Sequence, residues 1–93
     1  MKHSKRDMGR RLKILRRIHS IRQEDLAEAL SATKDQIKQW EIGRASTPPE
    51  YVGVLIEKFG ITSDWVYYGI VDGLSAAKLR EIREAEEDDL DAA

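Results

Sequence analysis

The sequence contains no cysteine, which excludes disulfide bonds and thiolate metal sites. Its two histidines, His3 and His19, have no carboxylate or thiol partner at the spacing of metal ligands, so we expect no metal. No apolar run approaches the length of a membrane-spanning helix, and the basic start lacks the apolar segment of a signal peptide. Nucleophile motifs and phosphate-binding loops are missing as well. We therefore expect a cytoplasmic protein that is not an enzyme, binds no cofactor and does not associate with a membrane.

The charges are divided unevenly along the 93 residues, although the formal net charge is only −1. Residues 1–44 contain 12 Lys or Arg and 6 Asp or Glu, which gives a net charge of +6. Residues 45–93 contain 4 and 11 of these, a net charge of −7. Because the basic charge is concentrated in one half, the near-neutral total does not argue against a polyanionic partner.

Apolar residues recur at helical spacing in segments that glycine and proline separate, and no segment has the pattern of a strand. We expect helices over residues 7–19, 23–30, 34–41, 48–59 and about 63–68. Thr33 and Gln36 match a capping box at the start of the third helix, and Thr47 is the expected cap of the fourth. The fourth helix has an apolar stripe, which consists of Val52, Leu55, Ile56 and Phe59.

The chain divides into a flexible basic N-terminus (residues 1–6), a helical domain (residues 7–69) and a C-terminal extension (residues 70–93). A short sixth helix over residues 75–84 is left open, with Leu79 and Ile82 as a weak apolar face. The last residues, EAEEDDLDAA, look disordered, and we expect the fold to survive removal of residues 75–93. The acidic tail is expected to be solvated. The alternative is that it competes with a polyanionic partner for the basic half of the chain.

Only Ser31 and Ala32 separate the second expected helix from the cap of the third. Helices joined so tightly must cross at a steep angle, as in a helix-turn-helix, here over residues 23–41. Such a turn usually needs a residue with positive φ, which Ser31 would adopt at a cost of roughly 1–2 kcal/mol. The third helix buries only Ile37 and Trp40 and shows polar side chains suited to base edges on the rest of its surface. It can therefore protrude into a major groove about 12 Å wide.

In these features the sequence resembles the XRE-type family of helix-turn-helix proteins, which includes lambdoid phage repressors and Cro proteins. The matching residues are Leu12, Arg16, Gln23-x-x-Leu26-Ala27, Ile37-x-x-Trp40-Glu41-x-Gly43, Pro48 and Gly60-Ile61-x-x-Asp64-Trp65. They extend over about residues 8–69 in the order and at the intervals of the family. The resemblance implies an all-α, five-helix domain and a sequence-specific transcriptional regulator. It further implies a repressor of phage or prophage type that binds a near-palindromic operator in double-stranded DNA as a homodimer, associated with the nucleoid when bound.

The resemblance also implies roles for individual residues. Base-reading positions fall on Lys34, Asp35, Gln36, Lys38 and Gln39. Phosphate-binding positions fall on Arg22, Gln23, Thr33 and Arg44. Arg16 and Glu41 match a buried ion pair, and the segment that commonly builds the dimer corresponds to Trp65, Val66, Tyr67 and Tyr68.

Two residues depart from the family pattern. Arg22 stands where a Ser or Thr cap is usual, so either it binds phosphate or Ser20 and Gln23 form the box instead. Asp35 is unusual beside a polyanion. It would either accept from cytosine N4 or stabilise the start of its own helix without touching DNA.

Other interpretations of the same residues remain open. The polar third helix could be an ordinary solvated face, and the basic residues Lys2, Lys5 and Arg6 could serve solubility or track phosphates. An antitoxin that represses its own operon would need a toxin-binding segment, for which residues 70–93 are the candidate. A protein-interaction module without DNA binding would act through residues 65–68 and the tail.

Overall fold

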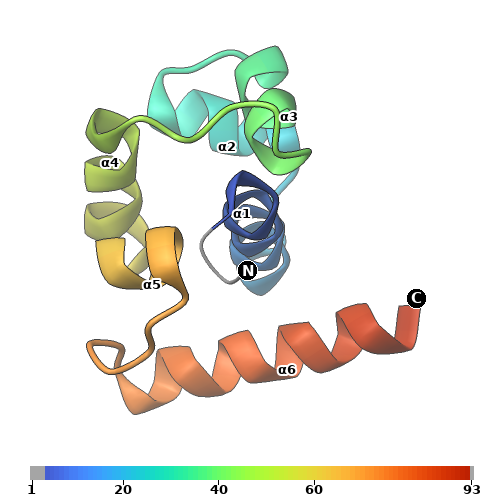
Figure 1. Ribbon diagram of the computed structural model, residues 1–93, viewed down its shortest axis with the longest axis vertical. Coiled ribbons are helices and arrows are strands. Elements are labelled where there is room, and N and C mark those ends of the chain that lie inside the picture. The colour runs from blue at the N-terminus through green and yellow to red at the C-terminus, as the bar shows by residue number, and fades with distance from the viewer. Residues whose placement is uncertain (1–3, 93) are drawn as a thin grey trace.

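The computed structural model describes residues 4–92, with side chains described through residue 88, and within this range the chain forms six α-helices and no strand. The helices are α1 (Lys5–His19), α2 (Gln23–Leu30), α3 (Lys34–Glu41), α4 (Pro49–Phe59), α5 (Ser63–Tyr68) and α6 (Ala76–Ala92). Helix α1 lies at the centre, with α2 and α3 on one side of it, α4 and α5 on another and α6 beneath (Figure 1). The predicted all-α class is confirmed.

One hydrophobic core joins all six helices. Its fully buried side chains are Leu12 and Leu15 of α1, Leu26 of α2, Ile37 of α3, Val52 and Leu55 of α4, Val66 of α5 and Ile82 of α6. The apolar stripe predicted for α4 is correct at Val52 and Leu55 but wrong at Ile56, which is 39% exposed. Among the described residues, no helix is long and apolar enough to cross a membrane.

The turn between α2 and α3 has the predicted conformation. Ser31 is left-handed, with φ 55° and ψ 39°, and it closes the C-terminus of α2. Ala27 is buried there, where a larger side chain would separate the two helices. The capping box of α3 is present too, because the Thr33 hydroxyl accepts from the Gln36 amide at 3.1 Å and the Gln36 side chain accepts from the Thr33 amide at 2.9 Å.

Two other predicted caps are wrong. Helix α4 begins at Pro49 rather than Pro48, since a residue that precedes a proline is disfavoured in the helical region; Pro48 is extended, with ψ 151°. The Thr47 side chain caps no helix and is buried. Ser20 does not start α2 but ends α1 in a left-handed conformation, with φ 53°. The start of α2 is stabilised by Asp25, whose carboxylate accepts from the Arg22 amide at 2.9 Å.

Helix α1 begins earlier than predicted, at Lys5. The Ser4 hydroxyl caps it by accepting from the Asp7 amide at 3.1 Å. Residues 4–6, predicted to belong to a flexible N-terminus, therefore form the cap and first turn of α1. Lys2 and His3 lie outside the described residues.

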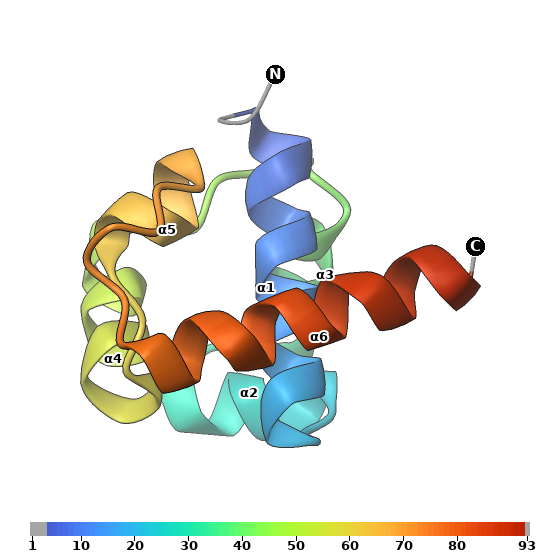
Figure 2. The same cartoon turned by 90° about the horizontal axis from the view of Figure 1, so that it is seen from below.

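Helix α6 is longer and more deeply packed than predicted. It continues to Ala92 and crosses α1 (Figure 2), where Ile82 is 1% and Ala85 is 8% exposed. The Ser75 hydroxyl accepts from the Lys78 amide at 3.1 Å at the start of this helix. Residues 84–92, predicted to be disordered, therefore continue α6. The core positions of Ile82 and Ala85 also contradict the expectation that residues 75–93 are dispensable for the fold.

Candidate nucleic-acid interface

Helix α3 presents the side chains predicted to read bases. Lys34, Asp35, Gln36 and Lys38 are exposed and Gln39 is half-buried. On the opposite side of the helix, Ile37 and Trp40 are at most 5% exposed, and Trp40 packs against Tyr51 of α4 with ring centroids 5.0 Å apart. The polar face of α3 is therefore open to a partner while its apolar face is fixed in the core.

The predicted ion pair between α1 and α3 is present. The Arg16 guanidinium donates from Nε and Nη2 to the two Glu41 carboxylate oxygens at 2.6 and 2.8 Å. The Glu41 side chain has no exposed surface. The hydrogen bond to this buried carboxylate raises the pKa of Arg16 above its ordinary value, so the guanidinium stays charged.

Gln23, at the start of α2, is the third member of this network. Its Nε2 donates to Glu41 Oε1 at 3.1 Å. An amide nitrogen carries two hydrogens, so the same group can bond Glu41 and still donate to a phosphate. This arrangement fixes the direction of the side chain at the positive end of α2, where anions bind favourably.

Three other predicted contact residues also have partners within the chain. Arg22 is exposed and forms an ion pair with Asp25 at 3.1 Å, which raises the pKa of Arg22. Lys34 lies 3.4 Å from the Glu24 carboxylate on α2. The Thr33 hydroxyl, which accepts a hydrogen bond in the capping box, can still donate its own hydrogen to a phosphate.

Arg44 is exposed directly after α3, and its amide donates to the Gln39 carbonyl at 3.0 Å. Gly43, with φ 83°, makes this turn possible. A Cβ at Gly43 would lie only 2.8 Å from the Arg6 Cα, so the start of α1 packs directly on the segment that carries Arg44. The backbone thus brings Arg6 and Arg44 to the same edge of the molecule.

The segment predicted to build a dimer is divided by the fold. Trp65 and Val66 are 3% and 1% exposed in the single chain, so neither is available to a second subunit. The Tyr67 hydroxyl donates to the Thr47 carbonyl at 3.2 Å, while Tyr68 is 53% exposed. The prediction of a dimer contact therefore stays with Tyr67 and Tyr68 alone.

Two residues of α1 that were not predicted from the sequence, Arg11 and Gly9, hold α1 against α5 and α3. The Arg11 guanidinium donates to the carbonyls of Val66 and Tyr67 at 2.9 and 3.2 Å and so satisfies the end of α5. A Cβ on Gly9 would overlap the carbonyl oxygens of Trp40 and Glu41, so Gly9 permits the close approach of α1 and α3. A glycine inside an amphipathic helix was the available signal for that contact. Nothing in the sequence distinguished Arg11 from the other arginines.

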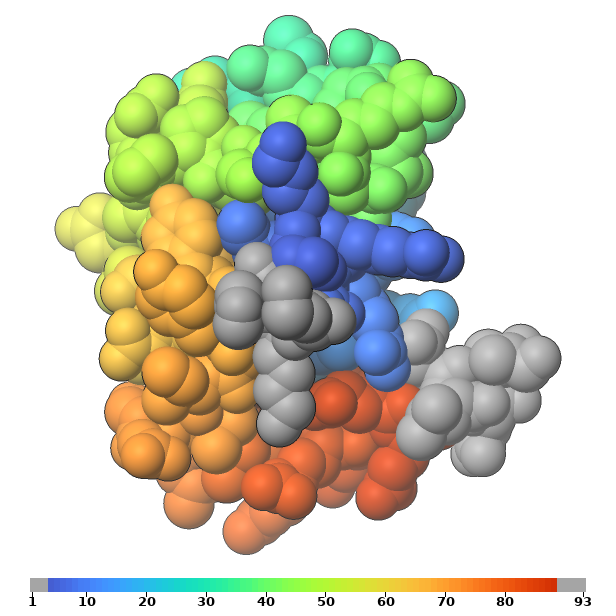
Figure 3. Space-filling model, in the orientation of Figure 1, coloured from blue at the N-terminus to red at the C-terminus, as the bar shows by residue number. Residues whose placement is uncertain are grey.

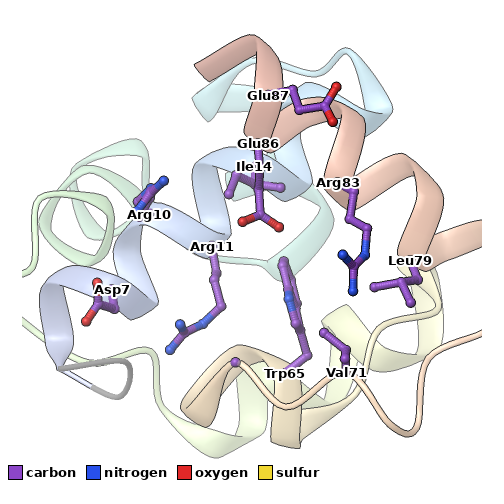
Figure 4. A pocket seen from close by; sticks show the side chains of 11 residues that line it. Asp7, Arg10, Arg11, Ile14, Trp65, Val71, Leu79, Arg83, Glu86 and Glu87 are labelled. Carbon is purple, nitrogen blue, oxygen red and sulfur yellow. The ribbon is translucent and has the colours of Figure 1, made fainter. Parts of the chain in front are cut away.

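A cavity of about 510 Å³ lies between α1, the end of α5 and α6 (Figure 4). Arg11, Trp65, Arg83 and Glu86 are among the residues that line it. Burial lowers the pKa of Arg11 there, and the negative charges of Asp7 and Glu86 act in the opposite direction. Among the described residues, three arginines and three carboxylates line this cavity, so it has no surplus of one charge. Among the described residues, no group of three His, Asp or Glu side chains is placed to hold a metal ion.

The tight α2–α3 turn, the buried support beneath α3 and its exposed polar face together define a helix-turn-helix. Over residues 7–64 the chain matches the family described as a helix-turn-helix domain, and it belongs to that family. Comparisons with curated proteins and with solved structures gave no match. Helix-turn-helix domains place their second helix in the DNA major groove, so family membership indicates a DNA-binding regulator.

Proposed function

We propose that the protein is a sequence-specific transcriptional repressor of phage or prophage type that binds a near-palindromic operator as a homodimer. The observation that carries this proposal is the pattern of exposed and buried side chains on α3. Four of its polar side chains are exposed, while Ile37, Trp40 and Glu41 fix the helix from behind. A rigid helix with one polar protruding face has the form that major-groove recognition requires.

In the proposed complex, α3 enters the major groove. Gln39 is suited to a bidentate contact with adenine, and Lys34 and Lys38 to guanine. Asp35 either accepts from cytosine N4 or stabilises the start of α3, as the sequence left open. Binding would require Lys34 to exchange Glu24 for a base or phosphate.

Phosphate contacts would fix the orientation of α3 on the duplex without reading its sequence. Gln23, held by Glu41, and Arg44, exposed after α3, would grip the backbone on either side of the groove. Arg22 and Thr33 would add to the contact beside Gln23. Repression would follow from occupation of a promoter.

The exposed apolar residues near the end of α5 support the homodimer. Tyr68 is 53% and Ile70 is 44% exposed, and the two lie close together in the chain. A second copy that covered them would remove apolar surface from water. A two-fold dimer would place its recognition helices about 34–36 Å apart, one turn of DNA.

Selection of bound duplexes from a random pool tests the proposal directly. We expect two inverted half-sites with centres about 10 base pairs apart. A pool that shows no enrichment, together with no salt-dependent affinity for duplex DNA, would contradict the DNA-binding function. A single half-site without symmetry would contradict the homodimer and leave DNA recognition standing.

A further inference from the structure

The recognition unit itself is acidic. Residues 23–43 contain two Lys and five Asp or Glu, a net charge of −3. Helix α1, in contrast, contains seven Lys or Arg and one Asp, a net charge of +6. Affinity for the DNA backbone comes mainly from neutralised phosphates. The charge for that affinity therefore has to come from outside the helix-turn-helix, and α1 is its largest source.

Four basic residues of α1 form a single stripe along the helix. Arg6, Arg10, Lys13 and Arg17 follow one another at intervals of four, three and four residues, and all four side chains are exposed. This spacing places them on one face. At 1.5 Å per residue the stripe is about 16 Å long, roughly the rise of five base pairs.

The stripe lines a groove of about 520 Å³ against the C-terminal end of α3, where Glu41 and Ile42 belong to the opposite wall. In Figure 3, side chains of α1, in blue, project between the green region of α3 and the red α6. Glu41 is already neutralised by Arg16, at 2.6 Å. Among the described residues, the other carboxylate in the lining is that of Asp7, whose pKa is lowered by its hydrogen bond from Ser4. Among the described residues, the four basic side chains outnumber the carboxylates that line the groove.

The groove reaches the C-terminal end of α3. Ile42, one residue beyond α3, is 44% exposed at the edge of the groove. Arg6 packs on Gly43, next to Arg44. On the far side of the stripe, Glu86 and Glu87 of α6 line the neighbouring cavity together with Arg10. Carboxylates balance the arginines of that cavity, so the side toward α3 is the one where basic side chains predominate.

We propose that this groove between α1 and the end of α3 is a second phosphate-binding surface, which holds the DNA backbone beside the bases that α3 reads. The inference rests on the proposed DNA-binding function. It assigns Arg6, Arg10, Lys13 and Arg17 to sequence-independent affinity, while specificity stays with α3. A surface of this kind would let an acidic recognition unit bind a polyanion.

The test uses three variants of the full chain: Lys13→Gln, Arg6→Gln and the double variant. The matched control is Lys58→Gln, on the exposed face of α4. Binding to a selected duplex and to a scrambled one is titrated by fluorescence anisotropy over a range of salt concentrations. Each stripe substitution should reduce the slope of log K against log salt by about 0.9 and weaken both duplexes about equally, roughly eightfold at 0.1 M salt. Lys58→Gln should leave slope and affinity unchanged.

Three results would overturn the inference. The double variant could keep the wild-type slope, it could lose affinity for the selected duplex only, or Lys58→Gln could act as strongly as Lys13→Gln. In each case wild-type binding to the selected duplex shows that the proposed function stands. A wild-type protein without duplex affinity would instead refute the proposed function. Thermal unfolding shows whether each variant is folded. If Arg6→Gln is unstable, the salt slope of Lys13→Gln alone tests the inference.

Discussion

The Arg16 guanidinium and the Glu41 carboxylate are joined by two hydrogen bonds of 2.6 and 2.8 Å across the contact between α1 and α3. The Glu41 side chain is completely buried, and that of Arg16 is 21% exposed. Gln23 of α2 donates to the same carboxylate at 3.1 Å. One buried carboxylate thus fixes the end of the recognition helix to the two helices behind it.

Arg16→Met should be strongly destabilising, because it leaves the Glu41 charge buried with only Gln23 as a partner. Breaking one side of a buried ion pair typically costs about 3–5 kcal/mol. The control is Arg22→Met, which removes an exposed ion pair with Asp25 and should cost far less stability than Arg16→Met. Urea denaturation measures both, and equal costs would show that Glu41 finds solvent or another donor in the variant.

Features of the fold that depend on neighbouring residues could be predicted from the sequence. Ser31 had to take a positive φ because the α2–α3 connection is so short, and Thr33 with Gln36 formed a local capping box. The ion pair between Arg16 and Glu41 was predictable only through the resemblance to the family. The caps at Thr47 and Ser20 failed where a competing local rule, a following proline or a left-handed helix end, decided the geometry.

Features that depend on distant residues could not be predicted. The apolar face of α6 looked weak because only Ile82 and Ala85 enter the core, and their depth depends on α1 beneath them. The groove between α1 and the end of α3 exists because the two helices approach closely at Gly9. The charge pattern of the sequence does not predict this approach. The predicted base-reading residues were exposed as expected, except that Gln39 is half-buried.

Gly9→Ala should destabilise the protein, whereas Gly53→Ala should stabilise it. A Cβ on Gly9 meets rigid carbonyl groups at the end of α3, and such overpacking typically costs about 1–3 kcal/mol. Nothing lies within 4 Å of a Cβ on Gly53, in the exposed part of α4. Alanine is favoured over glycine in a helix by roughly 0.5–1 kcal/mol. If the two substitutions changed the free energy of unfolding in the same direction, the close α1–α3 contact would be contradicted.

Ile82→Ala should cost about 2–5 kcal/mol, as expected for truncating a fully buried isoleucine. Ile56→Ala is the matched control, because Ile56 is 39% exposed and lies outside the proposed interfaces, so it should lose less than about 1 kcal/mol. Chemical denaturation compares the two. If Ile82→Ala is as mild as Ile56→Ala, α6 adds little to the stability of the core.

Gln39→Ala should relax the base preference at one or two positions of the selected site, by about 1–3 kcal/mol. Arg44→Ala should instead weaken binding to all sequences and reduce the salt slope by about one unit, since a phosphate contact carries no base information. Repeating the duplex selection with each variant separates these effects. An unchanged site preference for Gln39→Ala would refute its assignment as a base-reading residue.

The stability of the fold should decrease as the pH falls below about 6.5, because the ring of His19, at the end of α1, packs against α4 and α6 in a setting that disfavours its protonation. Burial lowers the pKa of His19 below its ordinary value of 6.5, and the nearby positive charge of Lys78 lowers it further. The His19 ring also packs on Phe59, with centroids 4.8 Å apart, and its Nε2 lies 3.3 Å from Lys78 Nζ. The unfolded chain takes up a proton near pH 6.5 while the folded chain does so only at lower pH, so acid favours unfolding in this window.

Urea denaturation at pH 7.5, 6.5 and 5.5 should therefore give a falling free energy of unfolding, and His19→Gln should flatten this dependence. The carboxylates with lowered pKa values cannot produce the same effect, because Asp7, Glu24 and Asp25 lose their stabilisation only below their ordinary values of 3.8 to 4.5. A pH dependence that persists in His19→Gln would place the titrating group elsewhere in the chain.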